Sequence, residues 1–136
     1  MSQFKIVPKE KWNVFWHRAA GFHKAMQKEE SPDVVVSNAV HCAISAIDAL
    51  SVLKNGKKSS GEHYNALFII KEIKTSDDAE RSRIISRLQE LIPLKSKGEY
   101  DDTNPSKKDA EKAVGLSRDI FNFVEKELRL SGAFQQ

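Results

Sequence analysis

Residues 31–56 read SPDVVVSNAVHCAISAIDALSVLKNG, and this stretch is the most apolar part of the chain. Both ends carry helix-boundary signals, because Ser31 suits an N-cap, Pro32 the first helical position and Gly56 a left-handed residue after the last turn. The polar side chains of residues 34–53 form one thin row: Ser37, Asn38, His41, Ser45, Asp48 and Ser51. That row spans about 140° of a helix circumference. The pattern predicts a central helix that its neighbours surround on most sides.

Four further helices are predicted around this stretch. The first begins at Pro8, fades near Glu29–Glu30 and buries an aromatic face; Gly21 within it would allow another helix to pack closely. The third follows an S-x-x-E capping box, Ser59 to Glu62, and we expect Tyr64, Leu67, Phe68 and Ile70 to face inwards. No segment alternates with a period of two for long, so no strand is predicted.

The second half of the chain predicts two more helices separated by a polar loop. The fourth is expected to begin after a cap at Thr75 or Ser76 and to end near Pro93. Residues 95–104 (KSKGEYDDTN) form the loop, and the last helix is expected to follow Asn104–Pro105 and to end before Gly132. Short connections make sequential helices antiparallel. We therefore expect an all-α, up-and-down bundle of four to five helices in a single domain over residues 1–136, with its core at about 8–130.

Composition limits the class of protein. The 136 residues carry a formal net charge of +3, which is compatible with a nucleic-acid partner but too weak to argue for one. The single cysteine, Cys42, has no partner for an internal disulfide, which fits a reducing compartment. No signal-peptide core and no run of eighteen apolar residues is present, so we expect a cytoplasmic protein without a membrane partner. We expect no cofactor, and one cysteine with scattered histidines gives no metal-ligand spacing.

The polar row supplies the first candidate site. His41, Ser45 and Asp48 are spaced i, i+4 and i+7 and share one face of the predicted helix. A histidine beside a carboxylate is suited to acid–base work or to binding a ligand hydroxyl. The same three side chains could instead satisfy one another inside the bundle, and that packing interpretation is favoured because no nucleophile or metal completes the set.

Residues outside the row complete the candidate ligand site. His63 lies where the third helix is expected to begin and could extend a pocket, or it could lie at the surface. Lys95, Lys97 and Tyr100 in the polar connection offer cations and a phenol for a phosphate and a base. The sequence-based hypothesis is therefore a ligand site formed by six residues: His41, Ser45, Asp48, His63, Lys97 and Tyr100.

Two segments of the chain resemble a known family. NAVHCAISAIDALSVLKNGKKSSGEHYNALFII (residues 38–70) and LKSKGEYDDTNPSKKDAEKAVGLSRDIFNFV (residues 94–124) are similar to the HEPN domain (higher eukaryotes and prokaryotes nucleotide-binding). The resemblance is carried by H-C-A-I-S-A-I-D-A-L together with the later E-Y-D, and it covers roughly residues 10–130. It implies a helical bundle of four or five helices that pairs as a homodimer. It also implies one of two functions. The protein either cleaves RNA, as toxin or defence ribonucleases do, or is non-catalytic and binds nucleotides or a nucleotidyltransferase.

The ribonuclease members carry an R-x(4–6)-H motif on the last long helix, and this chain departs from that pattern. Residues 105–136 contain Arg118 and Arg129 but no histidine. An R-x4-H match does occur on the first helix, from Arg18 to His23, where the two side chains lie about 140° apart. We therefore interpret the chain as a non-enzymatic HEPN-like bundle that binds a nucleotide, nucleic acid or protein partner as a homodimer. The alternative is a ribonuclease that uses Arg18 and His23 or the His41/Asp48 row.

Overall fold

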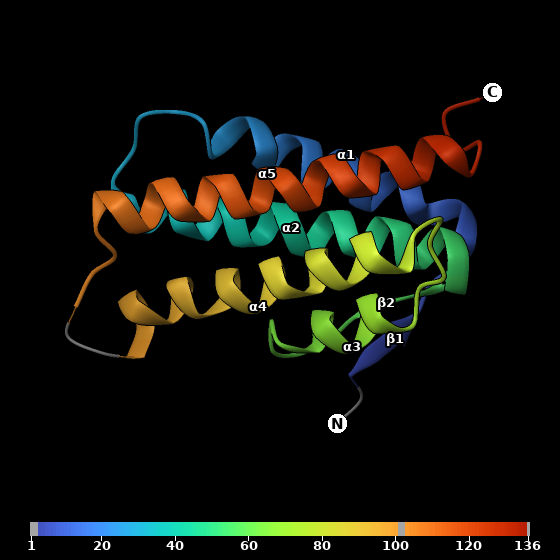
Figure 1. Ribbon diagram of the computed structural model, residues 1–136, viewed down its shortest axis with the longest axis horizontal. Coiled ribbons are helices and arrows are strands. Elements are labelled where there is room, and N and C mark those ends of the chain that lie inside the picture. Colours follow the sequence, from blue (N-terminus) through green and yellow to red (C-terminus); the bar gives the residue numbers. More distant parts are fainter. Residues whose placement is uncertain (1–2, 101–102, 136) are drawn as a thin grey trace.

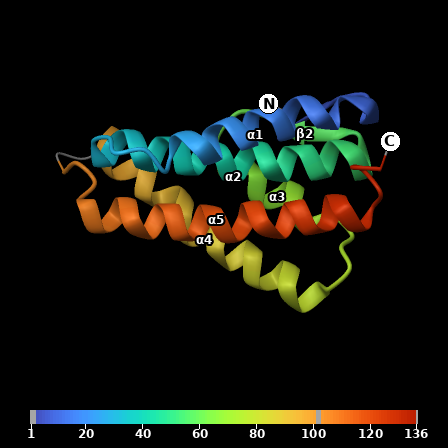
Figure 2. The same cartoon turned by 90° about the horizontal axis from the view of Figure 1, so that it is seen from above.

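A bundle of helices forms the structure, a computed structural model that describes residues 3–100 and 103–135, without the side chains of residues 97–100. Its helices are α1 (Trp12–Ala25), α2 (Pro32–Asn55), α3 (Asn65–Lys71), α4 (Asp78–Tyr100) and α5 (Lys107–Leu130). A short 3-10 helix, Lys9–Lys11, precedes α1. Helix α2 runs through the middle, with α1 and α5 packed along it and α4 on another side (Figure 1). In the second view α4 crosses the bundle obliquely (Figure 2). The predicted all-α bundle is confirmed.

Helix α2 has the bounds and the burial that its sequence predicts. It begins at Pro32, and Gly56 closes it with φ +68°, its N–H donating to the Val52 carbonyl at 3.0 Å. Ala39, Ala43 and Ala46 have no exposed surface, and such small side chains let neighbouring helices approach closely. The hydroxyl of Ser117 on α5 donates to the Ala39 carbonyl at 2.7 Å and ties the two helices together.

By length and composition α2 also passes the test for a membrane-spanning helix. The bundle, however, buries 67% of its most apolar window. A helix at the centre of a folded core needs the same apolar composition, so burial within the protein accounts for the sequence of α2.

A small sheet is present, contrary to the prediction of no strand. β1 (Phe4–Ile6) and β2 (Lys57–Ser59) pair antiparallel, with Phe4 opposite Ser59. Three residues are too few for alternation to be visible in the sequence. The predicted capping box from Ser59 to Glu62 is therefore wrong, because Ser59 lies in β2 and both its hydroxyl and its N–H donate to Asp48.

Helix α3 is shorter than predicted and presents another face to the core. It begins at Asn65 and buries Ala66, Ile69 and Ile70. Tyr64 and Phe68 were expected to face inwards, but they are 45% and 47% exposed. The prediction was right for Ile70, which is buried, and in part for Leu67, which packs half-buried against the core.

Helix α4 continues through Pro93 to Tyr100, so residues 95–100 are helical rather than part of a loop. Leu94 is only 8% exposed and belongs to the core, and its burial favours continuation of the helix despite the hydrogen bond that proline removes. The predicted cap of this helix is also wrong, because Asp77 rather than Thr75 or Ser76 accepts the Glu80 N–H, at 3.1 Å.

Helix α5 starts two residues after the predicted position. Its cap is Ser106, whose hydroxyl accepts the Asp109 N–H at 3.0 Å, while the Asp109 carboxylate accepts the Ser106 N–H at 2.9 Å. This reciprocal arrangement satisfies two N–H groups at the start of the helix. It replaces the predicted cap at Asn104–Pro105.

Candidate functional site

The one acid of the polar row, Asp48, holds the strand that follows α2. Its carboxylate accepts the Ser59 N–H at 2.7 Å and the Ser59 hydroxyl at 3.1 Å. Asp48 is 4% exposed, and burial is the largest cause that raises the pKa of its carboxyl, to about 6, while the two bonds from Ser59 lower it. Asp48 therefore fixes the start of the segment between β2 and α3.

The segment that Asp48 anchors carries His63, which meets His41 of α2. The centroids of the two imidazole rings are 5.5 Å apart and the rings nearly perpendicular, and the His41 ring also stacks on Phe22 at 5.3 Å. Three parts of the chain, α1, α2 and the turn before α3, thus form one aromatic cluster. The sequence-based hypothesis brought His41 and His63 together, and the structure places them in contact.

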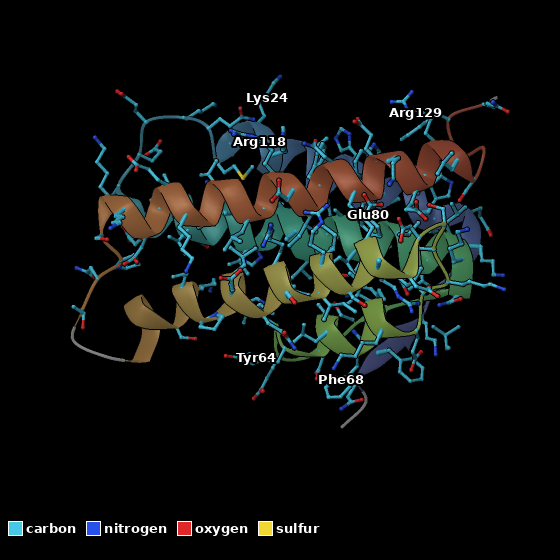
Figure 3. The ribbon with its side chains drawn as sticks, in the orientation of Figure 1. Lys24, Tyr64, Phe68, Glu80, Arg118 and Arg129 are labelled. Atoms are coloured by element: carbon cyan, nitrogen blue, oxygen red, sulfur yellow. The ribbon has the colours of Figure 1, made fainter. Side chains whose placement is uncertain are left out.

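Beside this cluster lies a cleft of about 370 Å³ between the turn before α3 and the second half of α4. Its lining combines a cation, a carboxylate, an imidazole, a phenol and apolar surface: Gly61, Glu62, His63, Tyr64, Ile92, Lys95 and Ser96. Figure 3 shows Tyr64 and Phe68 on the outer side of the molecule near α3, away from the other helices. Such a cleft offers a cationic group and an aromatic face to one ligand.

The other predicted site residues are not all brought to this cleft. Ser45 is half-buried along α2 and Asp48 contacts Ser59, and neither of them nor His41 lines the cleft. The side chains of Lys97 and Tyr100 lie outside the described residues. The prediction did not include Ile92 and Ser96, because it ended the helix near Pro93. Continuing α4 past Pro93 would have placed Ile92, Lys95 and Ser96 on one face at i, i+3 and i+4.

Arg18 and His23, the alternative catalytic pair, do not form a common site. The His23 ring stacks on Phe121 of α5 at 4.0 Å, and its Nδ1 lies 3.3 Å from the Gln27 amide nitrogen. The Arg18 guanidinium lies over the Phe15 ring at 5.3 Å. Burial lowers the pKa of His23, and Arg118 of α5 lowers it further, whereas Glu125 opposes the shift. The cation that acts on His23 is therefore Arg118.

Nucleophilic or metal chemistry finds little support among the described side chains. Burial raises the pKa of the Cys42 thiol to about 11, so the thiol is protonated at neutral pH. Within residues 3–96 and 103–135, no three His, Cys, Asp or Glu side chains gather as a metal site would require.

Comparison with known families agrees with this architecture. The family model of the HEPN domain matches residues 22–127, which include the aromatic cluster and the cleft. The chain belongs to the HEPN family. No curated protein and no solved structure gives a match. The resemblance seen in the sequence is thus confirmed, and α5 carries Arg118 and Arg129 but no histidine.

Proposed function

We propose that this protein is a non-enzymatic HEPN domain of the cytoplasm, active as a homodimer, that binds a nucleotide, free or as a unit of RNA. The observation that carries the proposal is the cleft beside His63 and Lys95. Its volume of about 370 Å³ falls in the range of small-ligand sites, which run from roughly 300 to 1,000 Å³.

The chemistry of the cleft suits the two halves of a nucleotide. Lys95 places an ammonium group at the cleft, and ammonium groups bind phosphate oxygens by charge-assisted hydrogen bonds. The exposed ring of Tyr64 offers a face on which a base can stack. His63, backed by His41, supplies a polar edge between the two. The carboxylate of Glu62 in the same lining would favour ligands that also present a donor, as nucleobases do.

A calorimetric titration of the full chain with AMP, GMP, CMP and UMP tests the proposal. We expect saturable binding of at least one nucleotide, weakened tenfold or more by Lys95→Ala and by Tyr64→Ala. Lys71→Ala is the matched control, because Lys71 is exposed on neighbouring α3 but does not line the cleft. Absence of binding to all four nucleotides, or equal binding by wild type and Lys95→Ala, would contradict the proposal.

The alternative, a ribonuclease, is tested in the same preparation. Histidine is a common general base, so a ribonuclease would use His23 with Arg18, or His41 with Asp48 of the polar row. Incubation with a mixed RNA pool should give no cleavage. Reproducible cleavage that is lost in Arg18→Ala, His23→Ala or His41→Ala would replace the binding proposal by the enzymatic one. Co-purification of a nucleotidyltransferase from the native host would identify a protein partner of the same domain.

A further inference from the structure

A second groove, larger than the cleft, lies at the N-terminal end of α5. It has a volume of about 610 Å³ and is bounded by the connection from α1 to α2, the first turn of α2 and the first half of α5. Its floor is apolar and continuous with the core, since Met26, Val35 and Ala110 are each at most 8% exposed. A floor of this kind gains stability when another apolar surface covers it.

The rim of the groove carries charges of both signs in equal number. Three cations and three carboxylates line it: Lys28, Lys107, Arg118, Glu29, Glu30 and Glu111. Within the described part of the chain, none of these six charged groups forms an ion pair. The rim is therefore neutral, although the whole chain carries a net charge of +3. Such a surface does not repel a copy of itself.

We infer that this groove is the surface through which two copies of the chain pair, α5 against α5, and this rests on the homodimer proposed above. A two-fold interface brings the same patch of both subunits together, so the patch must be complementary to itself. A neutral rim with both signs of charge around an apolar floor meets that requirement. An anionic partner such as RNA would meet the three carboxylates of the same groove.

The spacing along α5 gives the pairing. Glu111 and Arg118 are seven residues apart, about 10.5 Å along the axis, so they do not reach each other within one helix. Two α5 helices can cross antiparallel with the two-fold axis between Val114 and Gly115. Glu111 then lies opposite Arg118 of the partner subunit, and Arg118 lies opposite Glu111 of the partner subunit. The crossing thus forms the same ion pair twice.

Gly115 is consistent with a close crossing at this point. It lies in the middle of α5, where glycine costs about 1 kcal/mol against alanine, and a Cβ placed there would meet no atom of its own chain within 4 Å. Nothing within the subunit thus requires a glycine. The open space at this position leaves room for the helix of a second copy to pass closely.

Charge reversal at the two residues tests the inference directly. Sedimentation equilibrium of the full chain should show a wild-type dimer, and Arg118→Glu and Glu111→Arg should each weaken dimerisation at least tenfold. An equimolar mixture of the two variants should form a heterodimer, and the double variant should recover the homodimer. Lys112→Glu is the control, because it makes the same charge change on exposed α5 surface outside the groove.

Each outcome has a separate meaning. A wild type that stays monomeric up to 100 μM removes both this surface and the homodimer, while the nucleotide titration of the cleft still stands or fails by itself. If Arg118→Glu weakens dimerisation no more than Lys112→Glu does, the chain dimerises through another surface and only this inference is overturned. Failure of the mixture to associate, when circular dichroism shows both variants folded, also overturns the inference.

Discussion

The carboxylate of Asp48 accepts both the backbone N–H and the hydroxyl of Ser59, at 2.7 and 3.1 Å. Glu127 of α5 binds Ser76 in the same way, at 2.8 and 2.6 Å, and is 2% exposed. Two buried acids on core helices thus each hold a serine in a connection on either side of α3. Because the cleft lies beside α3, these two contacts position it.

Asp48→Asn should change how stability depends on pH. The raised pKa, about 6 against 3.8 for an ordinary aspartate, means that the folded state binds the Asp48 proton more tightly than the unfolded state. The contribution of Asp48 to the free energy of unfolding therefore falls as pH rises from about 4 to about 6. Asparagine resembles the neutral form and lacks this loss. Relative to wild type, the variant should gain about 2–3 kcal/mol across that window.

Urea unfolding at pH values between 4 and 8 measures this difference. Asp33→Asn, at an exposed position in the first turn of α2, is the matched control and should show no such trend. If the free energies of unfolding of Asp48→Asn and wild type changed in parallel over the whole pH range, a raised pKa of the buried Asp48 carboxyl would be contradicted.

Glu127→Ala should loosen the connection between α3 and α4. The substitution leaves the N–H and hydroxyl of Ser76 without their acceptor and opens space in the core, which together should cost about 2–3 kcal/mol. The rate of amide hydrogen exchange should rise more at residues 74–77 than in α2. Glu125→Ala, two residues away and without a hydrogen bond to that connection, serves as the control. Unchanged exchange at residues 74–77 would show that this contact is not what holds the connection.

These anchors also show where the sequence was informative. The bounds of α2 followed from Pro32 and Gly56, because helix ends leave local signals in the residues that form them. Ser59 carried an equally local signal, a capping box, yet its hydroxyl is bound by Asp48, eleven residues earlier in the chain. A tertiary hydrogen bond of this kind leaves no trace in the spacing around Ser59.

The candidate site was predictable to a similar extent. His41 and His63 were both chosen, but their ring contact depends on how the segment after β2 folds back over α2. The cleft additionally needs Ile92, Lys95 and Ser96 on one helical face. A proline is a strong local breaker, so the sequence ended α4 too early; the burial of Leu94, which outweighs it, is visible only in the folded chain.

Gly21→Ala should stabilise the protein. Gly21 was expected to allow close packing of α1 against another helix, but a Cβ at this position meets no atom within 4 Å. Alanine should therefore add only helix propensity and reduce the entropy of the unfolded chain, for a gain of about 0.5–1 kcal/mol. Thermal unfolding of the two proteins measures it. A lower melting temperature for the variant would mean that Gly21 makes a contact with another molecule.

Ala46→Leu should destabilise the bundle at its centre. Ala46 has no exposed surface and belongs to the hydrophobic core, so a larger side chain must displace its neighbours. Overpacking of this kind costs about 1–3 kcal/mol. Val34→Leu enlarges a side chain of the same helix that is 39% exposed, and it should change the free energy of unfolding by less than about 0.5 kcal/mol. Equal urea midpoints for the two variants would show that α2 is not closely packed at Ala46.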